Sequence, residues 1–182
     1  MRILRPLRLV AIATLLGTAL VGCGEEEGKG NAGAKPAATL EGEGFSVKMP
    51  DSPKRQVITA QTASGPVPIT AYITEGGEEG FSLSVLTVPK GVRSDLEGAV
   101  KGAASSVKGT LKDTTPTRYQ GFAARDARIT NAADQNGNKG TVFARVILAK
   151  GRMFQLQFVT GGADVKSPPA SYTRFVSSLK IG

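Results

Sequence analysis

Cysteine and histidine, the side chains that most often serve as nucleophiles, general bases and metal ligands, are scarce in this sequence of 182 residues. It contains a single cysteine, Cys23, and no histidine. Without histidine there is no Ser–His or Cys–His nucleophile pair, and the commonest general base and the commonest zinc, copper and iron ligand are missing. The Gly-x-Ser-x-Gly and phosphate-loop patterns are absent as well. We therefore predict no catalytic residue, no cofactor-binding residue and no metal ligand, and we predict no cofactor.

Two polar clusters could in principle bind a cation or move a proton. Residues 134–140 read Asp-Gln-Asn-Gly-Asn-Lys-Gly, but Lys139 stands where a calcium loop needs glycine, and Arg145 where it needs a bidentate glutamate. We interpret this segment as a hairpin tip, because Asn-Gly between two strands is typical of one. Residues 75–79 contain three glutamates in a Gly-rich turn. An acid–base pair needs rigidly held carboxylates with different pKa values, so we interpret this cluster as a solvated loop.

The cysteine follows an N-terminus with three parts. Residues 1–8 carry three arginines and no acidic residue, and residues 9–22 are apolar apart from threonine and glycine. This order is typical of a secretory signal. A buried core helix is one alternative. A membrane-spanning helix is the other, but it needs about 20 apolar residues, whereas this run has 14.

The segment Leu20-Val21-Gly22-Cys23 resembles the lipobox of bacterial lipoproteins. In that family a diacylglyceryl group is joined to the cysteine sulfur, the chain is cut before the cysteine, and the new amine is acylated, for example with palmitate. The resemblance implies that residues 1–22 are a lipoprotein signal peptide and that Cys23 is the lipid attachment site. It also implies localisation on the cell membrane or outer membrane, with the domain facing the periplasm or the exterior. The alternative is an ordinary signal followed by an accidental cysteine.

Residues 23–43 have the composition of a tether. They are rich in glycine, alanine, glutamate and lysine, and Leu40 is the only large apolar residue before Phe45. Such a segment buries too little apolar surface to fold. We predict a lipidated cysteine and flexible tether over 23–43 and a single domain over 44–182. Because the only cysteine would carry lipid, no disulfide is available, and the core must stabilise the domain.

The charge is distributed unevenly along the chain. Removal of residues 1–22 leaves 20 basic and 15 acidic residues, a net charge of +5, with −4 over residues 24–100 and +9 over residues 101–182. The basic half is either a contact face for anionic lipid or an acidic partner, or an ordinary solvated surface, which we favour. The absence of a binding motif and an aromatic content of 5% argue against nucleic acid. The candidate partners are membrane lipid through Cys23, an envelope protein and a small ligand; the sequence predicts no oligomeric state.

Short segments in which apolar and polar residues alternate are separated by Gly and Pro turn signals, which predicts strands. There are eight of these: 45–49, 56–61, 67–74, 81–85, 114–119, 122–130, 142–148 and 154–158. Lys150-Gly151 is expected to join the last two as a hairpin. In the final strand we predict three apolar side chains in the core and the two glutamines between them on the other face: Phe154, Leu156 and Phe158 inward, Gln155 and Gln157 outward.

Two segments have apolar residues at helical spacing. Ser94 and Glu97 form a capping box for the first, and Gly109 suits its end. Ser167 is expected to cap the second, with Pro168 in its first turn. Their apolar faces are Leu96, Val100, Ala103, Ala104 and Val107 in the first helix, and Tyr172, Phe175, Val176 and Leu179 in the second. Two helices and about eight strands in hairpin order predict an α+β fold with a largely antiparallel sheet.

Four runs within residues 43–182 resemble small lipoproteins of the PsbP/Mog1/DcrB-like group: 45–50 (FSVKMP), 121–125 (GFAAR), 151–156 (GRMFQL) and 175–181 (FVSSLKI). The resemblance implies an antiparallel sheet packed with two or more helices and a binding or accessory role, without a shared catalytic set. We therefore expect a membrane-anchored, non-catalytic module of the cell envelope. The alternative is an envelope hydrolase or transferase that depends on carboxylates, lysine, serine or tyrosine.

Overall fold

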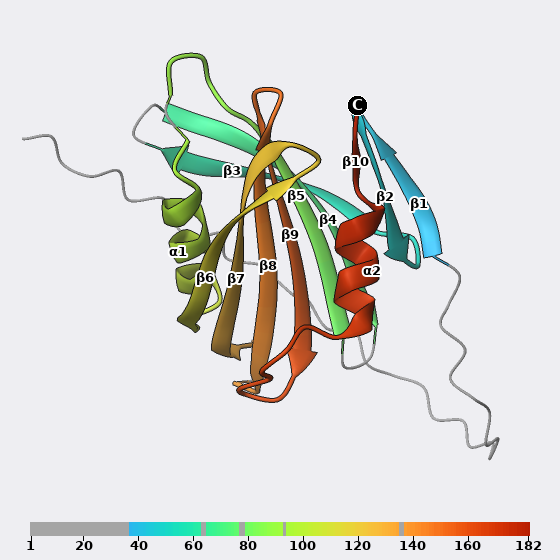
Figure 1. Ribbon diagram of the computed structural model, residues 1–182, viewed down its shortest axis with the longest axis vertical. Coiled ribbons are helices and arrows are strands. Elements are labelled where there is room, and N and C mark those ends of the chain that lie inside the picture. The colour runs from blue at the N-terminus through green and yellow to red at the C-terminus, as the bar shows by residue number, and fades with distance from the viewer. Residues whose placement is uncertain (1–36, 63–64, 77–78, 93, 135–136) are drawn as a thin grey trace, which may run out of the picture.

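The computed structural model describes residues 37–62, 65–76, 79–92, 94–134 and 137–182 (Figure 1). Within these residues the chain forms ten strands and two helices: β1 (Ala37–Gly42), β2 (Phe45–Pro50), β3 (Lys54–Thr62), β4 (Gly65–Gly76), β5 (Glu79–Thr87), α1 (Leu96–Ser106), β6 (Thr110–Tyr119), β7 (Phe122–Ala133), β8 (Lys139–Ala149), β9 (Arg152–Gly161), α2 (Ala170–Ser178) and β10 (Lys180–Ile181). The architecture is α+β with antiparallel sheets, as predicted. Neither described helix has the length and apolar character needed to span a membrane.

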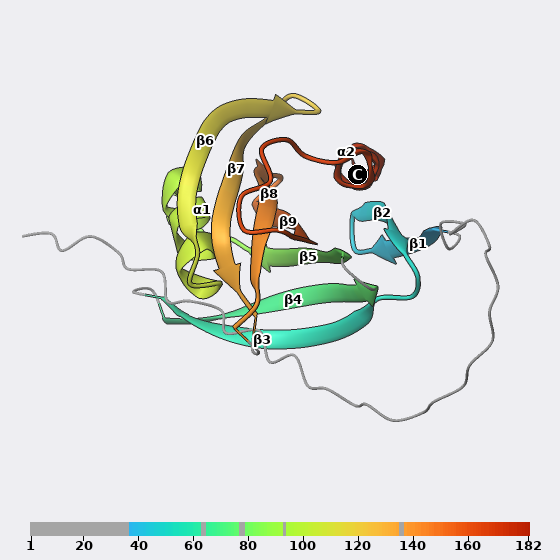
Figure 2. The same cartoon turned by 90° about the horizontal axis from the view of Figure 1, so that it is seen from below.

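The strands form one large and one small antiparallel sheet. The large sheet has the order β3-β4-β5-β9-β8-β7-β6, so β5 and β9 are neighbours at its centre although they are far apart in sequence. The small sheet has the order β1-β2-β10. Figure 2 shows the large sheet bending, with α1 on one side and α2 and the small sheet on the other. The chain thus forms three layers, with most of the large sheet in the middle one.

Two tight turns fix the register of the strands on which the candidate site is built. Lys150 and Gly151 have φ values of 50° and 72°, and Gln120 and Gly121 have values of 50° and 82°. Two successive positive φ values are typical of the type I′ turn, whose twist matches that of the flanking strands. The predicted Lys150-Gly151 hairpin is therefore confirmed. A two-residue turn sets which residues lie opposite each other on the strands it joins.

One side of the large sheet carries an aromatic core. Phe154, Leu156 and Phe158 are 1%, 0% and 0% exposed, whereas Gln155 and Gln157 lie half-buried on the other face. This confirms the predicted orientation of β9. Edge-to-face ring contacts link β9 to β2 and β5, and β5 to α2. Such contacts stabilise aromatic pairs beyond their buried area, so the rings hold α2 and the small sheet against the large sheet.

The other side of the large sheet is closed by α1. This helix packs against β6, β7 and β8 through a face of small side chains: Ala99, Val100, Ala103 and Ala104. Because α1 and α2 lie on opposite sides, β8 is buried on both faces. The alternation predicted for this strand consists of Val142, Ala144, Val146 and Leu148. The structure also buries Phe143 and Ile147, which lie between these positions on the opposite face.

The predicted tether is wrong over its last part. Residues 37–42 form β1, which pairs antiparallel with β2 and places Leu40 opposite Val47. Leu40 packs against the aromatic core, and a Cβ at Gly42 would overlap the ring of Phe45. Composition predicts a coil here because few apolar residues are present, but a strand partner supplies the backbone hydrogen bonds. The domain therefore begins by residue 37 rather than residue 44; Cys23 and residues 1–22 lie outside the described residues.

Both helices begin later than predicted. Asp95, and not Ser94, caps α1: its carboxylate accepts a hydrogen bond from the backbone N–H of Glu97 at 2.9 Å. The Glu97 side chain meets Lys101 one turn later rather than closing a capping box. In α2 the cap residue is Pro169, with no side-chain hydrogen bond. A proline disfavours helical geometry at the residue before it. The Pro168-Pro169 pair therefore moves the start of the helix beyond the predicted Ser167 cap.

Candidate functional site

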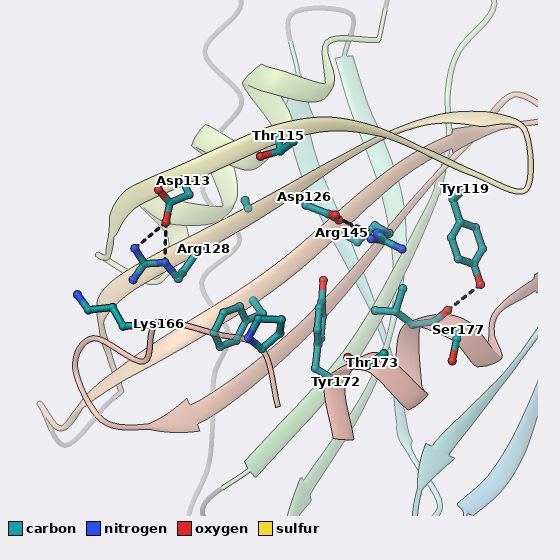
Figure 3. A pocket seen from close by; sticks show the side chains of 14 residues that line it. Asp113, Thr115, Tyr119, Asp126, Arg128, Arg145, Lys166, Tyr172, Thr173 and Ser177 are labelled. Atoms are coloured by element: carbon teal, nitrogen blue, oxygen red, sulfur yellow. Dashed lines mark hydrogen bonds and ion pairs between the residues drawn. The ribbon is translucent and has the colours of Figure 1, made fainter. Parts of the chain in front are cut away.

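A cavity of about 390 Å³ lies between α2, the segment that precedes it, and strands β6, β7 and β8 (Figure 3). We call it the α2 pocket. It is lined by fourteen residues: Asp113, Thr115, Tyr119, Asp126, Ala127, Arg128, Phe143, Arg145, Lys166, Pro168, Tyr172, Thr173, Val176 and Ser177. The volume is at the lower end of the range for small-molecule sites.

The floor of the α2 pocket is a cross-strand ion pair between β7 and β8. Asp126 lies opposite Arg145 in the ladder. Arg145 donates two hydrogen bonds to the carboxylate, from Nε to Oδ1 at 2.6 Å and from Nη2 to Oδ2 at 2.7 Å. The guanidinium also stands 5.6 Å from the centre of the Tyr119 ring, within the range of a cation–π interaction. The hydrogen bond with Asp126 raises the pKa of Arg145, so this group stays positively charged.

A second charged group forms the rim of the pocket. Arg128 on β7 lies opposite Asp113 on β6 and donates to its Oδ2 from Nε at 2.6 Å. Arg128 also donates from Nη1 to Oδ1 of Asp164 at 2.6 Å, and Lys166 contacts the other oxygen of Asp164. The hydrogen bonds from Lys166 and Arg128 lower the pKa of Asp164. The rim thus ties the segment before α2 to the edge of the sheet.

The α2 wall of the pocket presents a tyrosine hydroxyl. Tyr172 is 7% exposed, and its ring lies 5.8 Å from that of Phe143 and 6.1 Å from that of Phe158. Its hydroxyl makes no hydrogen bond with any described residue, and Figure 3 shows it directed toward the Asp126–Arg145 pair. Burial, and then the nearby Asp126 carboxylate, raise the pKa of Tyr172 well above its ordinary value. The phenol is therefore neutral and has an unused hydrogen-bonding capacity.

The far end of α2 is tied to the β6–β7 turn. The Tyr119 hydroxyl lies 2.7 Å from the carbonyl oxygens of both Val176 and Leu179, and its single proton is shared between these two acceptors. Gln120 Nε2 donates to the same Leu179 oxygen, also at 2.7 Å. The last carbonyls of a helix have no partner within the helix, so these side chains satisfy them. They also fix the separation between α2 and the sheet.

The arrangement favours binding over proton transfer. Asp126 and Asp113 are each engaged by an arginine, and the hydroxyls of Thr115, Thr173 and Ser177 stand without a histidine to activate them. Among the described residues no three acidic, cysteine or histidine side chains are grouped as metal ligands would be. The polar groups in the α2 pocket can orient a ligand through hydrogen bonds.

None of the polar clusters considered in the sequence lines the α2 pocket. Asp134 and Asn138 bond to each other at the β7–β8 connection, where Asp134 accepts from the Asn138 backbone and amide at 2.8 Å each. This fits the predicted hairpin tip, although residues 135–136 lie outside the described part of the chain. Glu79 accepts a hydrogen bond from Ser171 at 3.2 Å, away from the pocket. The predicted loop over 75–79 is wrong at both ends, because Glu75 lies in β4 and Glu79 in β5 and the two strands pair there; residues 77–78 lie outside the described residues.

The sequence contained a signal for the pocket that was missed. Asp126 and Arg128 are two apart on one predicted strand, so their side chains must share a face. Arg145 interrupts an otherwise apolar strand between Phe143 and Ile147. A charged residue on a face that is otherwise buried requires a partner, which points to a paired carboxylate on a neighbouring strand.

No family model and no curated protein matches the sequence. Among solved structures the fold is similar to the solution structure of cyanobacterial PsbP (CyanoP) from Synechocystis sp. PCC 6803, with a TM-score of 0.56 and 11% identity over 86% of this chain and 98% of that one. A Pseudomonas aeruginosa protein of unknown function, PA94, described as a putative regulator, matches with a TM-score of 0.38 and 12% identity over 71% and 85% of the two chains. The second similarity is too low to carry an argument. The first shows that the fold of this chain is PsbP-like.

Proposed function

We propose that the protein is a membrane-anchored lipoprotein of the cell envelope and that its PsbP-like domain is a non-catalytic binding module. The observation that carries the binding role is the α2 pocket. Its charged side chains are held in ion pairs, and the Tyr172 hydroxyl, which makes no hydrogen bond with a described residue, faces those pairs. An active site usually holds an unpaired nucleophile or a general base, whereas a ligand site needs an apolar lining with a few oriented polar groups.

The balance of charge in the pocket indicates the kind of ligand. The ion pairs join three cations, Arg128, Arg145 and Lys166, to three carboxylates, Asp113, Asp126 and Asp164. A ligand with a net charge would have to displace a partner from one of these pairs, at the cost of leaving another charge unsatisfied. We therefore infer a small ligand without net charge, with an apolar body beside Phe143 and Val176 and a polar group at Tyr172.

Native mass spectrometry of the full chain, extracted from its own membranes in mild detergent, tests the pocket. The expected result is a bound small molecule on the wild type and its loss from Tyr172→Phe, which removes only the hydroxyl. Ser105→Ala, an exposed hydroxyl on α1, is the matched control and should retain the molecule. Equal retention by Tyr172→Phe and by the pocket-filling variant Thr173→Trp would place the ligand elsewhere.

The anchor is supported by Leu20-Val21-Gly22-Cys23 and the signal-like residues before it. With β1 beginning at Ala37, the tether that we propose is confined to residues 24–36. Mass spectrometry of the N-terminal peptide should find mature protein that begins at Cys23 with acyl chains attached. Cys23→Ser should leave the membrane fraction, and a Cys23→Ser protein that stays wholly membrane-bound would contradict the anchor.

A carboxylate-, lysine- or serine-dependent hydrolase or transferase is the second candidate. The observation in its favour is that Tyr172, with its strongly raised pKa, lies beside the Asp126 carboxylate, because perturbed titratable groups cluster at active sites. Turnover of an envelope ester or glycoside by the purified full chain, lost in Asp126→Asn but not in Ser105→Ala, would replace the binding role with an enzymatic one.

A further inference from the structure

The two outer strands of the large sheet differ in how they are protected. An edge strand exposes unpaired backbone groups that can pair with another chain, and proteins block such pairing with charges, proline and bulges. β6 has all three: Pro116 lies within it, Lys112 and Arg118 are exposed on it, and the ladder is irregular between Leu111 and Asp113. Strand addition at the β6 edge is therefore disfavoured.

The β3 edge lacks these devices along most of its length. It begins with Lys54 and Arg55, but residues 56–60 contain no charge and no proline. β3 pairs with β4 on one side, and no described segment pairs with its other side. Val57 on this strand is 58% exposed, the most exposed large apolar side chain among the described residues. Over residues 56–60 the edge is thus uncharged, free of proline and open, with an exposed apolar side chain at Val57.

We propose that β3 pairs antiparallel with β3 of a second copy of this chain, about a two-fold axis through Val57. This register places Lys54 opposite Ala60 and Arg55 opposite Thr59, so no like charges face each other. In this register odd-numbered residues lie opposite odd-numbered residues and even-numbered opposite even-numbered. Each face of one sheet therefore continues into the same face of the other. The two Val57 side chains meet at the axis and cover the apolar surface that each exposes alone.

Self-complementarity argues for a second copy over a foreign strand. A two-fold interface uses the same patch twice, and the charges of β3 lie at one end, where the antiparallel arrangement separates them. The surface area that two paired edge strands bury is small compared with that of a stable interface. The association is therefore weak in solution and is favoured where copies are concentrated together. Val57 does not line the α2 pocket, so this inference and the proposed binding role can fail independently.

Cysteine cross-linking of the full chain in its native membranes tests the pairing. Opposed residues in an antiparallel pair have Cα atoms about 4.5 or 5.5 Å apart, and both distances are compatible with a disulfide. Val57→Cys should therefore give a disulfide-linked dimer under mild oxidation. The wild type, with Cys23 alone, should give none.

Two further variants control for collision and for register. Thr59→Cys is exposed on the same strand, but the proposed register separates it from its own copy by four residues, or about 13 Å along the strand. Lys112→Cys is exposed on the β6 edge. Both should form several-fold less dimer than Val57→Cys. Comparable dimer from either variant, or a disulfide to a different protein, would overturn the proposal.

A charge at the axis gives an independent measurement. Val57→Lys places two like charges opposite each other in the proposed pair, and its exposure means that the fold should not change. Sedimentation velocity of the full chain in detergent should show a concentration-dependent dimer for the wild type and a monomer for Val57→Lys. Identical association of both chains, with unchanged circular dichroism, would contradict pairing through β3.

Discussion

The two sides of the large sheet are covered by helices of different character. α1 presents alanine and valine to β6, β7 and β8. α2 presents Tyr172, Phe175 and Val176, and its most extensive contacts with another element are with β2. The α2 pocket lies between α2 and the same three strands that α1 covers from behind.

The difference shows how side-chain size decides whether a helix closes a sheet or leaves a site on it. Small residues let a helix approach closely, and packing then reaches the density of a protein interior. Large rings at one end of α2 fill the aromatic core, while the Tyr119 hydroxyl fixes its other end. The remaining space over β6–β8 on the α2 side is bordered by ion pairs. The α1 side, by contrast, is packed with small apolar side chains that contribute to stability.

The largest effect is expected in the aromatic core. Phe154 is 1% exposed, and Phe154→Ala should lower the free energy of unfolding by about 3–5 kcal/mol, because a cavity replaces the ring. Urea denaturation measures this change. Val159→Ala on the same strand, 41% exposed, is the matched control and should cost far less. A Phe154→Ala protein as stable as the wild type would refute the face assignment of β9.

Enlarging one residue on each helix tests the comparison directly. Ala104 lies on the face of α1 that packs against the sheet and is 5% exposed. Ala104→Leu should therefore destabilise the fold by about 1–3 kcal/mol through overpacking. Ser177 lines the α2 pocket and is exposed, so Ser177→Leu should change stability by less than about 0.5 kcal/mol. Equal thermal shifts for the two variants would mean that the two sides of the sheet are packed alike.

Tyr119→Phe tests what holds α2 over the pocket. The variant removes the hydroxyl that bonds to the carbonyls of Val176 and Leu179 and should cost about 1 kcal/mol. Gln120 still serves the Leu179 oxygen, which limits the loss. In the Tyr119→Phe variant, amide hydrogen exchange at the end of α2 should become faster than in the wild type, whereas exchange in α1 should change less. Tyr72→Phe, on a tyrosine that contacts Phe45 through its ring, should leave α2 exchange unchanged.

The smallest effect is the pH dependence of the pocket rim. The hydrogen bonds from Lys166 and Arg128 lower the pKa of Asp164 from its ordinary 3.8. A depressed pKa contributes stability above the unfolded value, and that stability is lost as the pH falls through the folded value. Asp164→Asn should therefore melt slightly below the wild type at pH 7, and the difference should shrink as the pH falls below about 4 and vanish once the pH is below the depressed pKa of the folded state. A difference that grows in acid would contradict the ion pair.

Local patterns predicted the parts of the fold that depend on neighbours in sequence. The alternation of Phe154, Leu156 and Phe158 gave their orientation, because side chains on a strand point to alternate faces. The dipeptide Lys150-Gly151 indicated the turn because glycine readily adopts the positive φ values that a two-residue hairpin needs. The start of α2 was misplaced, since Ser167 looked like a cap while the following prolines prevented the helix from beginning there.

Three further features depended on segments that meet only in the folded chain. β1 was interpreted as tether because its composition is poor in apolar residues, yet pairing with β2 makes it a strand. β10 is two residues long and follows α2, too short for any period to be visible. The α2 pocket combines β6, β7, β8 and α2, and Tyr172 was predicted only as a core residue.

The sequence by itself determined the α+β class, the inward face of β9 and the apolar sides of both helices, because each follows from the spacing of residues a few positions apart. It also carries the signal-like N-terminus and the lone cysteine on which the proposed anchor rests. The tertiary structure decided that Arg145 would meet Asp126, that Arg128 would bridge Asp113 and Asp164, and that a cavity would remain above them. These contacts depend on strand register and on how far α2 stands from the sheet, and both are set by packing among residues that are distant in sequence.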